Sequence, residues 1–417
     1  MSVLLSVDEA INRILARIEV CDKEVIGLAD ALGRILAEDV VAKDNVPPFD
    51  NSAMDGYGVR SDDVASASAD KPVPLQVVSD IKAGEYHADR VEPGHAVRIM
   101  TGAPVPPGVD AVVPVEQTDA AWGQDAHAPL DAQVSILSSV PVGAHIRRAG
   151  EDIRQGTVVL KEGTKLRAQE LGVLAAVGAA LVQVIRRPRV AILSTGDELI
   201  RVDEMLKPGK IRDSNSYSLA GLVEENGGTP IVLPSAADTF EAVRGLFQEA
   251  VSHHPDMIIT SGGVSVGAAD YIRDVVSEMG ELGFWRINLR PGKPLAYGHV
   301  RNVPFFGLPG NPVSVMVTFD VLVRPALRKM GGQPDDYPLR EAVLGETVRS
   351  DGRRTFVRVT LERRDGQLLA VLTGTQSSGA LSSMVLADGL LILPEGLTEA
   401  SEGERYPVRI LRSHFLV

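Results

Sequence analysis

The sequence has one cysteine, Cys21, among its 417 residues. A single thiol excludes an internal disulfide bond and any zinc site that needs several cysteines. The eight histidines form neither an HxH nor an HExxH motif, so the common histidine-based metal motifs are missing as well. No Ser/His/Asp or Cys/His set stands out along the chain, which argues against covalent acyl chemistry.

Basic residues are in the minority, and the sequence lacks a long apolar run. The 42 Lys and Arg residues face 55 Asp and Glu residues, which gives a net charge of −13 and argues against nucleic acid or an anionic membrane as a partner. An anionic small ligand would need a locally positive pocket. The uncharged run Leu171–Ile185 is too short and too rich in Gly and Ala to span a bilayer. Ser6 and Glu9 form a capping-box pattern that predicts a helix rather than a signal peptide, so we expect a cytoplasmic protein.

The remaining composition is that of an ordinary globular protein, with 44% hydrophobic and 23% charged residues. A length of 417 residues allows two to four domains. Apolar residues at helical spacing from Ile11 to Ile18 predict an N-terminal helix, and a second helix is expected at about Gly27–Val40. Short apolar runs between Gly and Pro clusters over residues 72–140 predict a β region, which we interpret as an insertion.

From residue 186 onward, predicted strands and helices alternate. Continuous apolar runs at Val190–Leu193 and Ile231–Leu233 predict buried strands, and Asp238 with Glu241 resembles a capping box at the start of a helix. This alternation predicts a doubly wound, mostly parallel sheet that is covered on both faces. After residue 332 the pattern returns to β, and a small barrel or sandwich is expected.

We therefore expect a multidomain α/β protein whose central domain is doubly wound. The expected domains are an extended helical and β domain (1–46 and 141–178), an inserted β domain (47–140), the α/β domain (179–331) and a C-terminal small β-barrel domain (332–417).

The most informative stretch is DMIITSGGVSVGAAD, residues 256–270. The apolar run Met257–Ile259 predicts a buried strand that ends in a glycine-rich loop. Glycine permits positive φ and close backbone approach, and the following helix start adds free N–H donors, so the loop could hold a phosphate. From this loop alone, a purely structural turn is an equally good interpretation. The stretch is not a P-loop, because Ala268 and Ala269 stand where that motif has Lys and Ser or Thr.

Ligands of open parallel sheets bind outside the carboxyl ends of the strands. Four unusual loops are expected to meet at that edge: Gly196–Glu198, Ser261–Gly267, Arg290–Lys293 and Pro309–Asn311. Basic side chains there suit an oxyanion, and the carboxylates of Asp197, Glu198 and Asp270 suit Mg²⁺.

Taken together, seven motifs resemble those of the molybdopterin molybdenumtransferase family, to which the E domain of gephyrin also belongs. They occur in the family's order and span nearly the whole chain. The motifs are PPFDNSAMDGYGV (47–59), IMTGAPVPPGVDAVVPVE (99–116), STGDEL (194–199), DSNSY (213–217), TSGGVSVGAADY (260–271), RPGKP (290–294) and GLPGNPVS (307–314).

The resemblance implies the last step of molybdenum cofactor synthesis. Adenylylated molybdopterin and molybdate would bind, the adenylate would be hydrolysed with Mg²⁺, and the dithiolene would ligate molybdenum as AMP leaves. The resemblance also implies an elongated homodimer of four-domain chains, with the active cleft between the α/β domain of one subunit and the inserted β domain of the other. It suggests the molybdopterin adenylyltransferase and recipient molybdoenzymes as protein partners.

By position in these motifs, the resemblance gives catalytic roles to Asp55, Thr101, Glu198 and Asp270, and Mg²⁺ ligation to Asp55, Glu198 and Asp270. Its substrate-binding residues would be Ser214, Asp238, Ser261, Gly262, Gly263, Ser265, Arg286, Arg290, Lys293, Pro309, Asn311 and Pro312. The glycine-rich loop would cradle the phosphate and pterin end, and the three basic residues would bind molybdate or stabilise developing phosphate charge. Helix capping explains Asp238 equally well, and Asx-turn chemistry alone could explain the loop around Asp55.

Two features depart from the family pattern. Ala268 occupies a position that is acidic in many relatives, and Arg286 and Arg290 replace lysines that are common in some, which keeps the charge but changes its geometry.

Two other functions stay open. A non-catalytic dimeric scaffold of the gephyrin E-domain type would not need the charged loops, and a general nucleotide-phosphate hydrolase would turn over ATP without a pterin.

Overall fold

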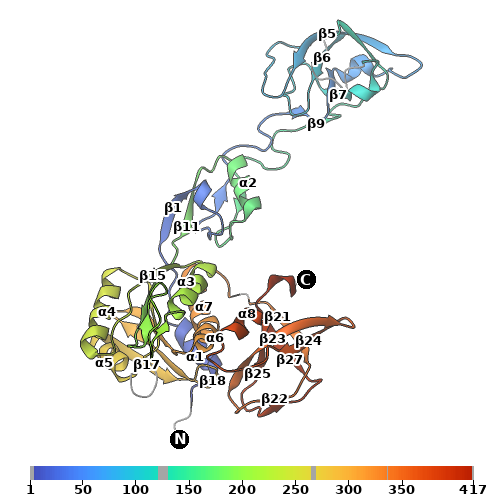
Figure 1. Ribbon diagram of the computed structural model, residues 1–417. Coiled ribbons are helices and arrows are strands. Elements are labelled where there is room, and N and C mark those ends of the chain that lie inside the picture. The colour runs from blue at the N-terminus through green and yellow to red at the C-terminus, as the bar shows by residue number, and fades with distance from the viewer. Residues whose placement is uncertain (1–3, 121–129, 264–268, 336, 416–417) are drawn as a thin grey trace. The chain divides into compact units, whose positions relative to one another are not determined.

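The structure, a computed structural model, describes residues 4–120, 130–263, 269–335 and 337–415. Its contacts divide the chain into two compact units (Figure 1). The larger unit comprises Met1–Glu24, Gly33–Ala37 and Gln183–Val417, and the smaller one comprises Val25–Leu32 and Glu38–Val182. None of the helices in the described ranges combines the length and the apolar character needed to cross a membrane.

A six-stranded sheet forms the centre of the larger unit. Its strands lie in the order β15 (Thr229–Val232), β12 (Arg189–Ser194), β16 (Met257–Ser261), β20 (Val303–Leu308), β19 (Pro294–Val300) and β17 (Gly280–Arg286). The first four strands run parallel, whereas β19 and β17 are antiparallel to their neighbours. The expected mostly parallel sheet is confirmed.

Alternate side chains of β12 enter two separate cores, because successive residues of a strand point to opposite faces. Val190 and Ile192 share one core with α1 (Val7–Leu15) and α3 (Asn215–Glu225). Ala191 and Leu193 share the other with α4 (Phe240–Ser252) and α5 (Ala269–Met279). Helices therefore cover both faces of the sheet, as the doubly wound prediction requires.

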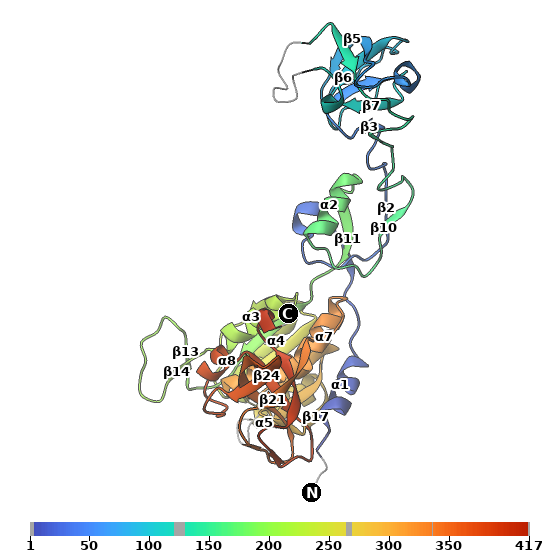
Figure 2. The same ribbon diagram turned by 90° about the vertical axis from the view of Figure 1, so that its right-hand side faces the viewer.

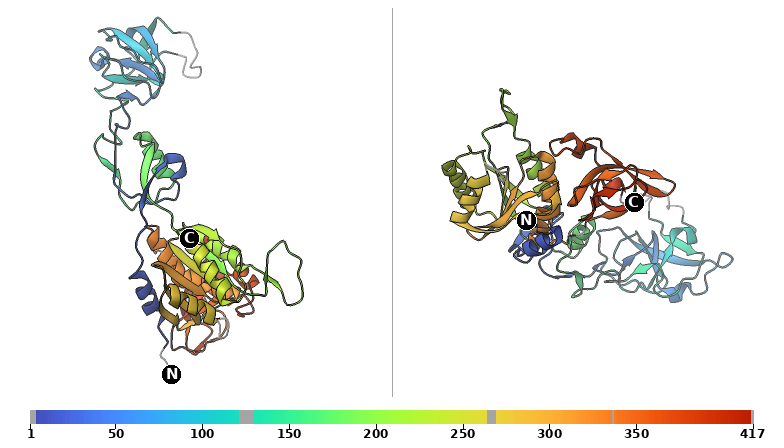
Figure 3. Two further views of the ribbon diagram at one scale, coloured as in Figure 1. Left: turned by 90° about the vertical axis from the view of Figure 1, so that its left-hand side faces the viewer. Right: turned by 90° about the horizontal axis from the view of Figure 1, so that it is seen from below.

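One long helical segment follows β20. It consists of α6 (Pro312–Thr318), a π-helical turn over Phe319–Val323, and α7 (Arg324–Met330). The N-terminal helix α1 packs against α7 (Figure 3).

The C-terminal region is a closed five-stranded barrel, not a sandwich. Its strands follow the order β23 (Arg354–Arg364), β24 (Gln367–Leu372), β21 (Leu339–Leu344), β27 (Arg405–Ile410) and β25 (Gly389–Leu393), and β25 pairs again with β23. Leu344, Val359, Leu391 and Val408 fill its interior. A short strand between β17 and β19 in sequence, β18 (Leu289–Arg290), pairs with β23 and so links the α/β sheet to the barrel.

A buried ionic cluster joins the π-helical turn to the barrel. Arg409 of β27 donates a hydrogen bond to Asp320 across 2.8 Å, and the Arg324 guanidinium lies 3.1 Å from Asp335. Tyr337 lies between the two arginines, 4.1 Å and 4.7 Å from their guanidinium carbons. Removing one partner of such a cluster leaves an uncompensated buried charge, so we expect this cluster to hold the helix and barrel together.

The smaller unit is built on a five-stranded sheet with its own core. The strand order is β7 (Ala111–Pro114), β4 (Gly56–Val59), β6 (His95–Ile99), β5 (Val73–Ile81) and β8 (Gln133–Ile136). Strands on either side of it in sequence pair with each other: β2 (Val40–Val41) with β10 (Val158–Leu160), and β3 (Asn51–Ser52) with β9 (Ile146–Arg147). Helix α2 (Ala168–Ala176) follows β10 in sequence.

The prediction of a second helix at about Gly27–Val40 is wrong. That segment contains the end of β1 (Lys23–Gly27), a 3-10 helix over Leu28–Asp30, and the start of β2. Gly33 adopts φ +76°, a conformation that interrupts a right-handed helix. The β-branched pair Val25 and Ile26 is better suited to the strand it forms.

The start of α4 also differs from the prediction. Its N-cap is Thr239, whose side-chain oxygen accepts a hydrogen bond from the backbone N–H of Ala242. Asp238 is therefore not the capping residue, and its carboxylate is available for another role.

Candidate functional site

The loops that were expected to meet do so at the carboxyl edge of the parallel strands, where residues 195–198, 261–263 and 309–311 follow β12, β16 and β20. Because β19 is antiparallel to β20, with Ala296 opposite Gly307, the preceding residues 290–293 reach the same edge. Arg286 ends β17 opposite Pro294, so it also lies there. We call this edge the rim.

The β16 and β20 loops lie against each other, and the β16 loop turns on two glycines. Gly262 and Gly263 have φ values of +87° and +67°, which disfavour other residues. A Cβ on Gly263 would lie 2.3 Å from Ile272, which is too close, whereas a Cβ on Gly310 would make an ordinary van der Waals contact of 3.6 Å with the Gly262 Cα. The backbone N–H of Gly262 donates to the Leu308 carbonyl across 3.1 Å.

The β12 loop holds a carboxylate over its own backbone. Gly196 has φ +146°, and a Cβ there would lie 2.5 Å from a carboxylate oxygen of Glu198. Figure 2 shows the loop between β13 (Leu199–Ile200) and β14 (Ile211–Arg212), which extends away from the α/β core. The N–H of Ile211 donates to the Glu198 carbonyl across 2.8 Å, so the base of this loop fixes Glu198.

Three carboxylates gather beside this loop. The backbone N–H of Asp238 donates to the Asp197 carboxylate across 3.2 Å. Burial, followed by the negative charges of Asp197 and Glu198, raises the pKa of Asp238 above its ordinary value. Like charges that raise a pKa in this way would be relieved by a bound cation.

The first turn of α3 joins two of the loops. The Asn215 amide nitrogen donates to the Ser261 hydroxyl oxygen and to the Gly310 carbonyl, both across 2.8 Å. Behind it, Ser216 donates to Asp213 across 2.6 Å and lies 2.8 Å from the Ser194 hydroxyl. The sequence reasoning selected the neighbouring Ser214, which is half-buried and makes no side-chain cap hydrogen bond at the start of α3.

A cavity of about 730 Å³ lies between the rim and the barrel. Six of the residues selected from sequence line it: Glu198, Arg290, Lys293, Pro309, Asn311 and Pro312. Asn311 donates to the Ser378 hydroxyl across 2.9 Å, which ties the β20 loop to the barrel. Arg286 is exposed and does not line this cavity.

The barrel contributes residues that the sequence reasoning missed, chiefly Arg349, Arg353, Arg358, Ser377 and Ser378. Arg358 is only 1% exposed, and its guanidinium donates to the Ser383 hydroxyl (3.1 Å) and the Ser377 carbonyl (3.0 Å). It forms no ion pair with any described residue, and burial lowers its pKa. Its sequence signal is a cation in the middle of the apolar strand Phe356–Leu361.

The other cations of the cavity differ in how far their charge is already balanced. Arg353 forms an ion pair with Asp351, and this hydrogen-bonded contact lowers the pKa of Asp351. Arg290 lies 4.0 Å from the same carboxylate. Lys293 is exposed and has no ion pair in the described part of the chain. Among the described residues that line the cavity, Lys293 is therefore an exposed cation without an ion pair, and Arg358 is a buried one.

Asp55 and Thr101, the two predicted catalytic residues of the smaller unit, contact each other. Both the backbone N–H and the hydroxyl of Thr101 donate to one Asp55 carboxylate oxygen across 2.7 Å. Two donors on one oxygen hold the carboxylate in a fixed position.

Part of the predicted site lies outside the described residues. Ser265 and Ala268 fall in the range 264–268, and for Asp270 the structure describes the backbone, in α5, but not the side chain. Within the described ranges, no cluster of three or more His, Cys, Asp or Glu side chains could hold a metal ion.

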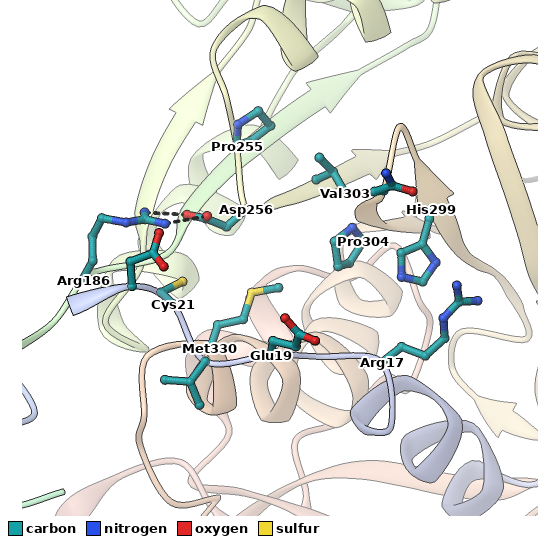
Figure 4. Close-up of a pocket in the computed structure, with 13 residues that line it drawn as sticks. Arg17, Glu19, Cys21, Arg186, Pro255, Asp256, His299, Val303, Pro304 and Met330 are labelled. Carbon is teal, nitrogen blue, oxygen red and sulfur yellow. Dashed lines mark hydrogen bonds and ion pairs between the residues drawn. The ribbon is translucent and has the colours of Figure 1, made fainter. Parts of the chain in front are cut away.

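Another cavity, of about 600 Å³, lies at the opposite edge of the sheet (Figure 4). Its cations are already paired: Arg186 binds Asp256 through two hydrogen bonds of 2.7 Å, and Arg17 pairs with Glu281. Burial raises the pKa of the Cys21 thiol to about 12, which makes it unreactive. This cavity therefore offers less to an anion than the rim does.

Three family models match the chain in sequence order. They describe the MoeA N-terminal region, domains I and II (residues 5–178), a probable molybdopterin binding domain (191–329), and the MoeA C-terminal region, domain IV (341–411). The rim lies within the second match and most of the barrel within the third.

Relatives resemble the chain over nearly its whole length. Molybdopterin molybdenumtransferase 2 of Mycobacterium tuberculosis is 39% identical over 97% of this chain and 98% of its own. The molybdopterin molybdenumtransferase of Bacillus subtilis is 35% identical over 98% and 94%. The crystal structure of the molybdopterin biosynthesis MoeA protein of Pyrococcus horikosii has a TM-score of 0.83 and 33% identity, covering 98% of this chain and 100% of that one.

Proposed function

The chain belongs to the molybdopterin molybdenumtransferase family and is an enzyme of molybdenum cofactor biosynthesis; from this premise we propose that it inserts molybdenum from molybdate into adenylylated molybdopterin. In the proposed reaction the phosphoanhydride bond is hydrolysed, AMP leaves, and the two dithiolene sulfurs ligate molybdenum.

The observation that carries this proposal is the cavity between the rim and the barrel. A tetrahedral oxyanion needs several donors and a net positive environment. Lys293 lines this cavity from the rim and Arg358 from the barrel, and neither forms an ion pair with a described residue. Hydroxyl groups of Ser377 and Ser378 complete a lining that suits molybdate.

The phosphate end of the substrate would bind next to this cavity. The glycine backbone of residues 262 and 263 and the hydroxyl of Ser261 supply donors at the end of β16. Because Asn215 connects Ser261 to Gly310, and Gly310 lines the cavity, the phosphate loop and the oxyanion cavity share one wall.

The carboxylates beside the β12 loop fit a magnesium ion. The charges of Asp197 and Glu198 add to the burial that raises the pKa of Asp238. Mg²⁺ needs only one or two protein carboxylates when it also binds phosphate oxygens, so it does not need the cluster of three that the described residues lack. Glu198 and Asp238 would hold the ion, together with Asp270 by family resemblance. When bound, Mg²⁺ would neutralise charge on the phosphoanhydride oxygens.

The protein's own groups would then act on water and on the leaving group. Glu198, held above Gly196, is placed to orient a water molecule toward the adenylyl phosphorus. Lys293 would stabilise the negative charge that develops on the pterin phosphate when AMP departs from it. Asp55, fixed by Thr101, would complete the site from the smaller unit of a partner chain, because we also propose a homodimer. We further propose that the enzyme acts in the cytoplasm.

The test is AMP release from adenylylated molybdopterin by the purified enzyme. We expect release that requires both molybdate and Mg²⁺ and that is accompanied by one molybdenum per pterin, measured by mass spectrometry. Glu198→Gln should lower kcat by about 100-fold, whereas Glu249→Gln, on the exposed face of α4, should not change it. AMP release without molybdate, or hydrolysis of ATP without a pterin, would contradict the proposal.

A further inference from the structure

The Asn215 side chain contacts the β16 and β20 loops of the rim, and the orientation of its amide is fixed by chemistry. The Gly310 carbonyl can only accept hydrogen bonds, so the group that lies 2.8 Å from it must be the amide NH₂ rather than the amide oxygen. The same nitrogen lies 2.8 Å from the Ser261 hydroxyl oxygen.

This contact decides what the Ser261 hydroxyl can do. An amide nitrogen has no acceptor capacity, so the Ser261 oxygen must accept from Asn215. A serine hydroxyl carries one hydrogen, and among the described residues no oxygen accepts it. Ser261 is therefore left as a donor at the end of β16, although it is only 3% exposed.

The observed position of Asn215 does not satisfy all of its own hydrogen-bonding groups. Its amide oxygen is buried and has no partner in the described part of the chain. An unpaired buried acceptor is unfavourable. The two hydrogen bonds that the amide nitrogen donates, to Ser261 and Gly310, therefore account for the position of this side chain.

We propose that Asn215 is a positioning residue that makes Ser261 an obligate hydrogen-bond donor toward a phosphate oxygen of the substrate. This inference deepens the proposed function and rests on it for the identity of the substrate. Phosphate oxygens at neutral pH are acceptors, so a hydroxyl held as a donor selects them over a group that can only donate.

The proposal distinguishes two substitutions of the same residue. In Asn215→Asp the carboxylate would accept the Ser261 hydrogen and so reverse the polarity of the hydroxyl. In Asn215→Ala the hydroxyl stays free to donate. Asn215 is the first residue of α3, where a carboxylate is favourable to the helix, so Asn215→Asp should fold.

The experiment measures AMP binding by isothermal titration calorimetry to the full-length protein. We expect Asn215→Asp to weaken binding by about 30-fold, Ser261→Ala by about 10-fold and Asn215→Ala by less than about 5-fold, because charge-assisted hydrogen bonds are the strong ones. In the Ser261→Ala background the hydroxyl that Asn215→Asp acts through is absent, and only direct repulsion between the new carboxylate and the phosphate remains. Asn215→Asp should therefore weaken binding there by no more than about 5-fold. The control is Asn226→Asp at the other end of α3, where the Asn226 amide donates to the Leu222 carbonyl.

Two outcomes overturn the inference. One is an Asn215→Ala loss as large as the Asn215→Asp loss, because that describes a purely structural contact. The other is an Asn215→Asp effect that is the same with and without the Ser261 hydroxyl. If the wild-type protein does not bind AMP at all, the inference also fails, while molybdate-dependent turnover would still support the proposed function. If AMP binds but no turnover occurs, the proposed function fails. The order of AMP affinities among the variants then still tests whether Asn215 acts through the Ser261 hydroxyl.

Discussion

Replacing Arg358 with methionine separates stability from molybdate binding. Arg358→Met removes a buried cation but keeps a long side chain of similar volume. Burial already lowers the pKa of Arg358, which means that the folded protein pays a desolvation cost for the charge. Replacing buried charged groups by apolar ones of similar size is neutral or stabilising by about 1–4 kcal/mol.

The opposing loss is that of the hydrogen bonds. The guanidinium donates at 3.1 Å to Ser383 and at 3.0 Å to the Ser377 carbonyl, with a longer contact of 3.4 Å to the Thr375 carbonyl. Because the donor is charged, the two shorter bonds contribute about 3–6 kcal/mol in total. Ser383 keeps its own bond to the Ala380 carbonyl, and the exposed Ser377 can bind water, so neither is left buried and unpaired. The two effects largely offset each other, and we expect the free energy of unfolding to fall by less than about 3 kcal/mol.

Binding of molybdate should change much more. A hydrogen bond from a charged donor contributes about 1.5–3 kcal/mol, which corresponds to roughly 10- to 100-fold in affinity. We therefore expect the molybdate KM to rise by that factor in Arg358→Met while the KM for adenylylated molybdopterin stays nearly constant. The matched control is Arg363→Met, at the exposed end of the same strand, which should leave both values unchanged.

The assay combines urea unfolding with steady-state kinetics at varied molybdate. A molybdate KM within about twofold of wild type would refute the assignment of Arg358 to the oxyanion, since a buried unpaired cation in the binding cavity should contribute at least tenfold. A loss of more than about 4 kcal/mol in stability would instead show that the guanidinium is chiefly structural.

Three further predictions concern stability and can be checked by urea unfolding. Thr239→Ala should lower the free energy of unfolding by about 1 kcal/mol through loss of the α4 N-cap, whereas Asp238→Ala should not lower it; the reverse order would restore Asp238 as the cap. Asp320→Asn should lower it by about 3–5 kcal/mol because Arg409 is left buried and uncompensated, and a change below about 1 kcal/mol would show that the cluster is not what joins helix and barrel. Because the pKa of Asp238 is raised in the folded state, its contribution to stability falls as pH rises above the unfolded pKa of about 3.9. The stability of Asp238→Asn minus that of wild type should therefore be larger at pH 7 than at pH 3.5. Equal differences at the two pH values would contradict this.

The sheet and its rim could be predicted from the sequence because burial on both faces produces an unambiguous pattern. Val190–Leu193 and Met257–Ile259 are apolar without interruption, and in the structure their alternate residues enter two cores. Once these strands are taken as parallel, their loops must lie at one edge. Lys293, Glu198 and Asn311 then line one cavity although they are far apart in sequence.

The errors arose where local signals compete. The stretch Gly27–Val40 contains apolar residues at helical spacing, but Gly33 at positive φ ends the helix pattern. Asp238 and Thr239 are both good N-cap residues, and sequence alone does not decide which one has the extended backbone that a cap requires. Thr239 has it, with φ −129° and ψ 150°.

The barrel's part in the site was missed because the meaning of Arg358 depends on strand register. Along β23 the residues from Thr355 to Val359 are all buried, and a charge in such a run is unusual. That signal was present in the sequence. The sequence did not reveal that β25 pairs with β23 and closes the barrel. This pairing fixes the path of β23 along the cavity wall.

The structural contacts of the rim are made largely by neutral amides, and this division has a physical consequence. Asn215 joins the β16 and β20 loops, and Asn311 joins the β20 loop to Ser378 of the barrel. Neutral hydrogen bonds can align these parts without neutralising the charges of Lys293 and Arg358, which form no ion pair with a described residue. A salt bridge in the place of either amide would add a carboxylate next to the proposed anion site and weaken it by direct repulsion. The cavity can therefore be rigid and still keep its positive charge for the ligand.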